Sequence, residues 1–217
     1  NPNTSKWIWK KGSNTVNQCG AYGKMSIPAR RNMPGARAGA VTWVDQTGNL
    51  WMFGGQGYDK QNNVGSLNDL WEYNPNTNKW TWMGGTNKIN QVGVYGTQGM
   101  PSSDNMPGGR SYSLSWVDKN GNFWLFGGNT YHGGSGQPIS NDLWEYNLTT
   151  HEWAWVSGSN KANQVGVYGT KGVPAATNMP GARKLSMGWV DNQGNLWLFG
   201  GFGYAATKGT GISIRDL

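Results

Sequence analysis

Aromatic and aliphatic residues alternate with other residues in short runs separated by turn-forming residues. Trp51 and Phe53 are two positions apart, and so are Trp80 and Trp82. A period of two places the side chains of each pair on the same face of a β-strand. DQTG, between the first two runs, is typical of a tight hairpin turn. The pattern predicts four strands in one repeating unit, at 39–44, 49–55, 69–74 and 79–82.

The whole chain is built from this unit. NPNTSKWIW, NPNTNKWTW and NLTTHEWAW start at positions 1, 74 and 147, and therefore at intervals of 73 residues. We divide the chain into repeats 1–73, 74–146 and 147–217. All 14 tryptophans fall into equivalent sets, which are Trp7/80/153, Trp9/82/155, Trp43/116/189, Trp51/124/197 and Trp71/144. This regularity predicts that tryptophan is repeated core and is equally buried in every repeat.

A further pattern recurs within the repeats: a double glycine after a hydrophobic strand, then a tyrosine, then a tryptophan seven positions later. Its members are Gly54-Gly55, Tyr73 and Trp80, then Gly127-Gly128, Tyr146 and Trp153, with Gly200-Gly201 opening a third instance. The pattern resembles the Kelch repeat, and the chain is similar to the Kelch domain of galactose oxidase and to bacterial extracellular Kelch proteins. The resemblance implies an all-β, Kelch-type β-propeller in which each repeat is one four-stranded blade.

The number of repeats raises the question of ring closure. Three blades are fewer than the four to eight that are usual in propellers. The chain opens on a predicted fourth strand without an initiator methionine and ends inside a third strand. We therefore expect a segment of a larger, six- or seven-bladed ring. The alternative is that two copies pair into one six-bladed ring.

The charge, the apolar runs and the cysteine count of the chain indicate which kinds of binding partner and environment fit it. Lys and Arg outnumber Asp and Glu by 18 to 11, but no basic block occurs, so nucleic acid is a poor candidate and acidic glycans or proteins are better ones. No apolar run approaches 18 residues, so no membrane span is predicted. One cysteine rules out an internal disulfide; Cys19 aligns with Val92 and Val165 and is expected to be buried. The Kelch resemblance implies a secreted, extracellular or cell-surface protein.

Strand alternation predicts where a ligand would bind. In an antiparallel sheet the second and fourth connections leave on one face, and both are long here, as in GQGYDKQNNVGS and in the loop between repeats. Function concentrates in such loops. The candidate ligand-binding residues on this face are Arg37, Arg110 and Arg183; Tyr22, Tyr95 and Tyr168; and Tyr58, Tyr131, His132 and Tyr204.

Two interpretations stay open for the repeated residues. The arginines either clamp an anionic ligand or pair with an acidic neighbour and loop carbonyls. The repeated tyrosines, with Asn and Gln of the loops, either contact a ligand or pack over the sheet and satisfy loop backbone groups.

Catalysis is disfavoured by elimination. Most acidic residues recur at equivalent positions, the two histidines lie on different kinds of loop, and no nucleophile elbow, phosphate loop or metal-spaced cluster occurs. We therefore predict no catalytic residue, no metal and no cofactor. The predicted function is a binding module for a glycan or a protein. The alternative, implied by the Kelch resemblance, is a sugar-modifying propeller similar to a sialic-acid mutarotase and acting on an acidic sugar.

Overall fold

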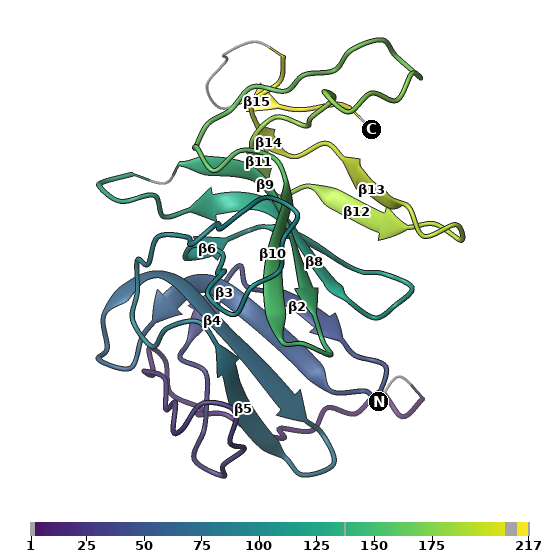
Figure 1. Cartoon of the computed structure of the whole chain (residues 1–217). Helices are drawn as coiled ribbons and strands as arrows, with labels where there is room; N and C mark the ends of the chain where they lie inside the picture. The colour runs from purple at the N-terminus through teal and green to yellow at the C-terminus, as the bar shows by residue number, and fades with distance from the viewer. Residues whose placement is uncertain (1–2, 137, 207–211, 217) are drawn as a thin grey trace.

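The computed structural model describes residues 3–136, 138–206 and 212–216, which form strands, turns and loops. No helix among these residues is long and apolar enough to cross a membrane. Figure 1 shows the sheets of successive repeats following one another, with the N- and C-terminal ends on opposite sides of the stack. The predicted all-β class is confirmed, and the antiparallel sheets are consistent with a β-propeller.

The strands of repeat 1 and the first strand of repeat 2 form one antiparallel sheet, which we call sheet 1. Its strands are β1 (Arg37–Ala38), β2 (Val41–Val44), β3 (Leu50–Tyr58), β4 (Val64–Asn74) and β5 (Lys79–Gly84). β1 and β2 pair with successive parts of β3, so they act as one interrupted strand at the inner edge of the sheet. β4 then pairs with β3, and β5 pairs with β4. This is the four-stranded sheet that the sequence predicts.

The remaining strands of repeat 2 and the first strand of repeat 3 form sheet 2, with the same order and register. Its strands are β6 (Arg110–Ser111), β7 (Leu114–Val117), β8 (Phe123–Thr130), β9 (Ile139–Asn147) and β10 (Glu152–Ser157). The cross-strand pair Trp116–Trp124 repeats the pair Trp43–Trp51 of sheet 1. Equal sequences at equal spacing therefore give equal pairing.

Repeat 3 contributes a less complete sheet 3. Its strands are β11 (Arg183–Lys184), β12 (Met187–Val190), β13 (Leu196–Phe199), β14 (Phe202–Gly203) and β15 (Ile212–Ser213). They pair in two separate groups, β11–β14–β15 and β12–β13, which we treat together as sheet 3. No fourth strand of sheet 3 is present among the described residues, so only sheets 1 and 2 show the predicted four. The strand expected at residues 6–9 is also absent. In sheet 1 the equivalent residue Trp80 pairs with Tyr73, and the described residues offer residues 6–9 no such partner strand.

The double glycines have a physical reason. The register of β3 against β4 shifts between Phe53 and Gly55, where Gly54 and Gly55 have φ of 68° and 102°. A Cβ on Gly54 would lie 2.7 Å from the Arg110 carbonyl oxygen of the next repeat. Glycine is therefore needed both for the left-handed backbone and for the close approach of sheet 2.

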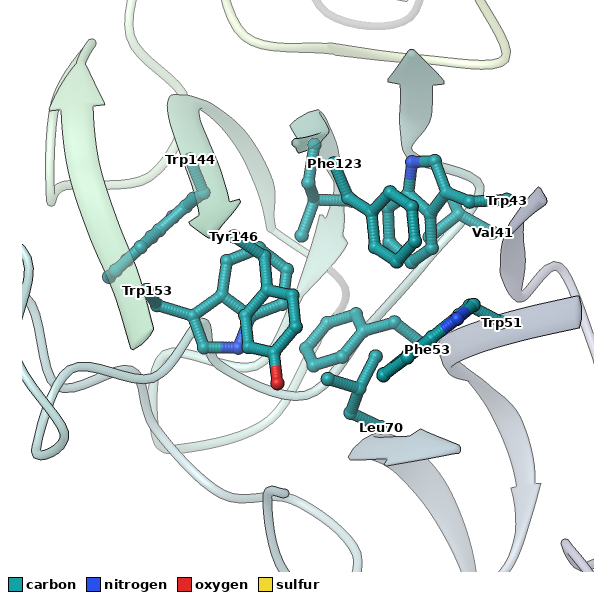
Figure 2. Close-up of a cluster of buried hydrophobic side chains, with 10 residues drawn as sticks. Val41, Trp43, Trp51, Phe53, Leu70, Phe123, Trp144, Tyr146 and Trp153 are labelled. Atoms are coloured by element: carbon teal, nitrogen blue, oxygen red, sulfur yellow. The ribbon is translucent and has the colours of Figure 1, made fainter. Parts of the chain in front are cut away.

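The main core lies between sheets 1 and 2, as Figure 2 shows. The Trp43 ring stacks on Phe123 at 5.0 Å between centroids and 7° between planes. Phe53 packs on Trp153 at 5.3 Å. The contact between the two sheets also includes strand backbone, because the Trp43 indole donates a hydrogen bond to the Trp124 carbonyl at 3.3 Å. The predicted use of tryptophan as repeated core therefore holds at this interface.

The long loop before each sheet covers the outer strand of that sheet. Ala29 bridges to Trp80, and the Ser26 amide donates to the Trp82 carbonyl at 2.8 Å. These bonds hold the loop against the sheet, but the first part of the loop, around Cys19, does not pack into the core. Cys19 is exposed, so the expectation that it is buried was wrong. Its equivalent Val92 is also exposed, because this part of the loop runs over the surface.

Burial of the tryptophans falls off at both ends of the stack. Trp43 and Trp51 are each 4% exposed, whereas Trp189 and Trp197 are 47% and 37% exposed. Trp7 is 99% exposed. Equal burial in every repeat was therefore a wrong prediction, because each tryptophan needs a neighbouring sheet to cover it.

We expect Trp51→Ala to lower the free energy of unfolding by ~3–5 kcal/mol, as large-to-small changes in a packed core do. Trp197→Ala should cost clearly less, because Trp197 is already 37% exposed. Urea unfolding in dilute solution measures both. Equal losses would contradict the burial difference.

Candidate functional site

An arginine–aspartate pair lies in each repeat beneath the face from which the two long connections leave, which we call the long-loop face. The pair is buried in repeats 1 and 2, and in repeat 3 the Asp216 side chain is 23% exposed. The three pairs are Arg37–Asp69, Arg110–Asp142 and Arg183–Asp216. In repeat 2 the guanidinium of Arg110 binds both carboxylate oxygens of Asp142, at 2.9 and 2.8 Å. Arg110 is 1% exposed and also donates to the carbonyls of Gly108 and Gly127, at 3.1 and 3.2 Å. One side chain therefore joins the preceding loop and three strands.

The repeated tyrosines complete the same network. The Tyr22 hydroxyl donates to Asp69 at 2.6 Å, and the indole of Trp71 donates to the same carboxylate at 2.7 Å. Tyr22 is 1% exposed. Tyr95 repeats this contact with Asp142 at 2.8 Å. The tyrosines therefore attach the long loop to the third strand of the sheet.

These contacts match the second interpretation that the sequence left open, in which the arginines pair with acidic neighbours and the tyrosines pack over the sheet. Arg110, Arg183, Tyr22 and Tyr95 point inward, and their polar atoms are bonded within the chain. Tyr168 differs in burial. Its hydroxyl binds Asp216, but it is 37% exposed because the described part of sheet 3 covers it less. A ligand lying on the surface would not reach the buried members in this conformation.

Electrostatics keep the network in one protonation state. Burial raises the pKa of the Tyr95 phenol, and the neighbouring Asp142 carboxylate raises it further. Burial alone would raise the pKa of Asp142, but the charge and hydrogen bonds of Arg110 lower it below its usual value. At neutral pH the phenol is therefore a neutral donor and the carboxylate a charged acceptor.

The amide side chains of the long loop also bond to backbone groups. Asn90 has a left-handed φ of 58°, and its side-chain oxygen accepts from the Ser66 amide at 2.9 Å. Asn163 does the same for Ile139 at 2.9 Å. Asparagine tolerates this backbone conformation better than most residues. These amides thereby tie the long loop to the neighbouring sheet.

The second-connection tyrosines occupy a different position. Tyr58, Tyr131 and Tyr204 are only half-buried and follow the ends of the second strands. Their amides donate to carbonyls of the long loop; for Tyr131 the acceptor is Gly109, at 2.7 Å. The Lys60 amide likewise bonds to the Asn87 carbonyl at 3.2 Å. The structure therefore brings the two long connections side by side, while Lys208 of the third loop lies outside the described residues.

His132 is the one candidate with a polar partner suited to proton transfer. Its Nε2 lies 2.9 Å from the Oγ of Ser140, which is fully buried. Burial lowers the pKa of His132; Asp142 opposes that shift and Arg110 supports it. A neutral imidazole is therefore favoured. The equivalent residue Asp59 instead closes its own loop by accepting the amides of Gln61 and Asn63.

The sequence interpretation missed a row of residues at the inner edge of the sheets. Gly39, Tyr112 and Leu185 are equivalent, and all three have a left-handed φ, of 66°, 59° and 57°. The Tyr112 amide donates to Gly39, and the Leu185 amide donates to Tyr112, at 2.8 and 3.0 Å. Tyr112 and Leu185 are 38% and 61% exposed. We call these three residues the inner-edge row.

A signal for this row was present in the sequence. Its members differ completely although they follow the invariant arginines by two positions. The preceding residue also varies, and in repeat 3 it is Lys184, whose ammonium lies 5.4 Å from the centre of the Phe202 ring. In repeats 2 and 3 a buried arginine is followed, two positions later, by an exposed side chain that differs between the repeats, which is typical of a binding surface on a fixed scaffold.

Metal-ligating groups do not gather in the described part of the chain. No three His, Cys, Asp or Glu side chains there lie where they could hold a metal ion together. The carboxylates nearest to the candidate site are those already paired with arginine.

Replacing the buried carboxylate tests the network. Asp142→Asn should lower the free energy of unfolding by ~3–5 kcal/mol at pH 7, because it leaves the Arg110 charge buried and unpaired. Asp104→Asn in an exposed loop position is the matched control, with an expected change within ~0.5 kcal/mol. Equal effects of the two variants in urea unfolding would argue against the pair as a structural requirement.

The same pair should give an acid transition. The pKa of Asp142 is lower in the folded protein, so its contribution to stability is present above its unfolded pKa and is lost as the pH falls through the folded one. Unfolding free energy should therefore decline below about pH 4, the usual range of aspartate. The decline should be shallower in Asp142→Asn, and an identical slope would refute this assignment.

Comparison with known proteins gives a distant likeness. No family model and no curated protein matches the chain. Among solved structures it is similar to one titled "Structure of YjhT", with a TM-score of 0.45 and 17% sequence identity. The likeness covers 79% of this chain and 61% of the other, so this chain spans less than two thirds of that protein's length. At this similarity it assigns neither an activity nor a ligand.

Proposed function

We propose that this chain is a non-catalytic binding module that recognises a glycan or protein partner through its long-loop face. The fold proposed with it is a Kelch-type β-propeller, of which the three repeats are blades. The double-glycine bulges, the repeated sheet order and the inward tryptophans support that fold. We also propose a secreted or cell-surface location, the setting of the extracellular Kelch proteins that the sequence resembles.

The observation that carries the proposal is the contrast between two layers of the long-loop face. We call the buried arginine–aspartate–tyrosine network its floor and the partly exposed loop side chains above it its rim. The floor is a repeated, buried network in which the guanidinium of Arg110 and its equivalents is fully engaged. The rim consists of partly exposed side chains: the equivalent Tyr58, Tyr131 and Tyr204, and neighbouring residues that differ between repeats, such as Tyr112 and His132. A rigid floor lowers the entropy lost when the rim binds a ligand, and the variation supplies specificity.

The chemistry of the rim suits a polar ligand with flat surfaces. Tyr58, Tyr131 and Tyr112 offer large, rigid side chains with a hydroxyl at the tip. Lys184 adds positive charge near the inner edge, in agreement with the overall charge of +7. We therefore favour an acidic glycan or an acidic protein surface. Nothing on the rim suggests nucleic acid or a membrane.

Loop variants test the proposed face. Tyr58→Ala, Tyr131→Ala and Tyr112→Gly should each weaken binding by ~10-fold or more, the effect of losing one buried aromatic anchor. Tyr112→Gly restores the residue of repeat 1 at that position, so the left-handed backbone is kept. Binding is measured on glycan arrays and by pull-down from the native environment.

The control variants lie in the turns on the opposite face. Gln46→Ala, Lys119→Ala and Asn192→Ala replace one residue in each of the three equivalent hairpin turns. They should leave binding unchanged. If the turn variants abolish binding and the loop variants do not, the proposed face is wrong.

The second candidate function is a sugar-modifying enzyme that acts on an acidic sugar. The residue that supports it is His132. The hydrogen bond between His132 and Ser140 and the lowered pKa of this imidazole suit a general base. Assays of anomer exchange and hydrolysis on acidic sugars distinguish the two functions. Turnover that is lost in His132→Gln but kept in His151→Gln would favour the enzyme, whereas binding without turnover supports the module.

A further inference from the structure

The positive charge of the chain is concentrated in its first part. Residues 1–44 contain seven Lys and Arg and no Asp or Glu, whereas residues 45–217 contain 11 of each kind. The whole net charge of +7 therefore comes from residues 1–44. One of these cations, Arg37, is paired with Asp69 inside the protein, so the surface of this segment is defined by the others.

A hairpin of the long loop, residues 21–33, carries part of this charge along the outer edge of sheet 1. The amides of Ala21 and Met33 each donate to the carbonyl of the other, at 2.8 and 2.9 Å, and close the hairpin. The Asn32 side chain donates to the Trp80 carbonyl at 3.1 Å, so the hairpin is fixed to the outer strand β5. Sheets pack on one another through their faces here, so this outer edge is not a surface that a neighbouring sheet covers.

Four cations lie at this edge, and we call them the edge cluster: Lys24, Arg30 and Arg31 of the hairpin, and Lys79 of β5. The Ala29 amide donates to the Trp80 carbonyl at 3.4 Å, which brings the backbone of Arg30 close to that of Lys79. The three hairpin cations are exposed, and Lys79 is half-buried. No carboxylate among the described residues forms an ion pair with any of the four.

A further cation shows that these charges lie close enough to repel one another. The Lys11 ammonium donates to the carbonyls of Arg30 and Asn78, at 3.1 and 3.0 Å. Burial lowers the pKa of Lys11, and the positive charges of Arg30 and Lys79 lower it further. Like charges that are held together destabilise the folded protein, and a bound anion relieves that repulsion.

The two arginines of the edge cluster are specific to repeat 1. The residues equivalent to Arg30 and Arg31 are Ser103 and Asp104 in repeat 2, and Ala176 and Thr177 in repeat 3. The hairpin itself recurs, because Val94 bridges to Met106 and Val167 to Met179 in the same way. The loop therefore folds without the arginines, and a role at the surface accounts for them better than a role in folding.

We propose that the edge cluster is a second binding surface, separate from the long-loop face, for a linear glycan that carries sulfate or carboxylate groups. The planar guanidinium of arginine binds such groups through two parallel hydrogen bonds, and lysine adds positive charge. A linear polymer repeats its charges along its length, so one molecule contacts several cations of the cluster at once.

Other anionic partners fit the edge cluster less well. Single-stranded nucleic acid binds where aromatic side chains stack on its bases, and the cluster contains none. The centre of a protein–protein interface is poor in lysine and rich in aromatic residues. A membrane-binding loop adds apolar side chains to its charges, but Ile27 of this hairpin has apolar equivalents, Met100 and Val173, in loops that lack the cluster.

Heparin, a sulfated glycan, is the probe that tests the proposal. Titration calorimetry at low salt should show binding to the wild-type chain, and the affinity should fall as the NaCl concentration rises. Arg30→Ser combined with Arg31→Thr should weaken binding by ~10-fold or more, because two charge-assisted contacts are lost. Both new residues occur at equivalent positions of other repeats, in Ser103 and Thr177, so the hairpin tolerates them. Absence of heparin binding by the wild type would overturn the proposal.

The matched control removes the same charge from exposed positions of repeat 3. Lys161→Thr combined with Lys171→Gln also introduces residues that occur at equivalent positions, in Thr15 and Gln98. This variant should keep the wild-type affinity for heparin, and circular dichroism should be unchanged in both double variants. Equal weakening in the two would overturn the edge cluster, because net charge alone would then explain binding.

Competing probes distinguish the class of partner. Single-stranded DNA, duplex DNA, polyglutamate and vesicles of phosphatidylserine and phosphatidylcholine should each bind more weakly than heparin, and tighter binding by any of them would overturn the glycan assignment. Tyr58→Ala and Tyr131→Ala should leave heparin binding unchanged, because both tyrosines belong to the long-loop face. A loss of heparin binding in these variants would show that the two surfaces are not separate. Failure of ligand binding at the long-loop face leaves the heparin result unaffected.

Discussion

The bidentate pair between Arg110 and Asp142, repeated in sheets 1 and 3, is the interaction on which the rest of the structure depends. A buried guanidinium is tolerated only when its charge is neutralised and its donors are used. Here the loop carbonyl of Gly108, the strand carbonyl of Gly127 and the Asp142 carboxylate meet these demands together. The pair thereby fixes the innermost strand against the third strand and fixes the long loop above both.

The use of the repeated arginines within the chain also distinguishes residues that hold the fold together from residues that are available to a ligand. The repeated arginines and tyrosines are used within the chain, whereas neighbours such as Tyr112 and Lys184 vary between repeats. The sequence contained a hint of the pairing, since Asp69 and Asp142 each follow their arginine by 32 positions. That spacing could not by itself distinguish an internal partner from a free anion clamp, because the distinction depends on whether the strands bring the two side chains together.

Local patterns predicted the strands of repeats 1 and 2 well, since alternation around Trp51 and the DQTG turn dictate pairing by themselves. Burial was harder to predict. Trp197 has nearly the same local sequence as Trp51, yet it is 37% exposed because no sheet among the described residues covers it. Cys19 is exposed because its loop runs outside the core. The missing strand at residues 6–9 has the same origin, as strand formation there requires a partner distant in sequence.

The stacking of sheets has a consequence for cooperativity. Strands of sheet 1 contact those of sheet 2, and sheet 2 in turn contacts sheet 3. Such an array behaves as a chain of nearest-neighbour couplings, in which each unit is stabilised by the units beside it. Among the described sheets, sheet 2 is coupled on both sides and should therefore be the last to open.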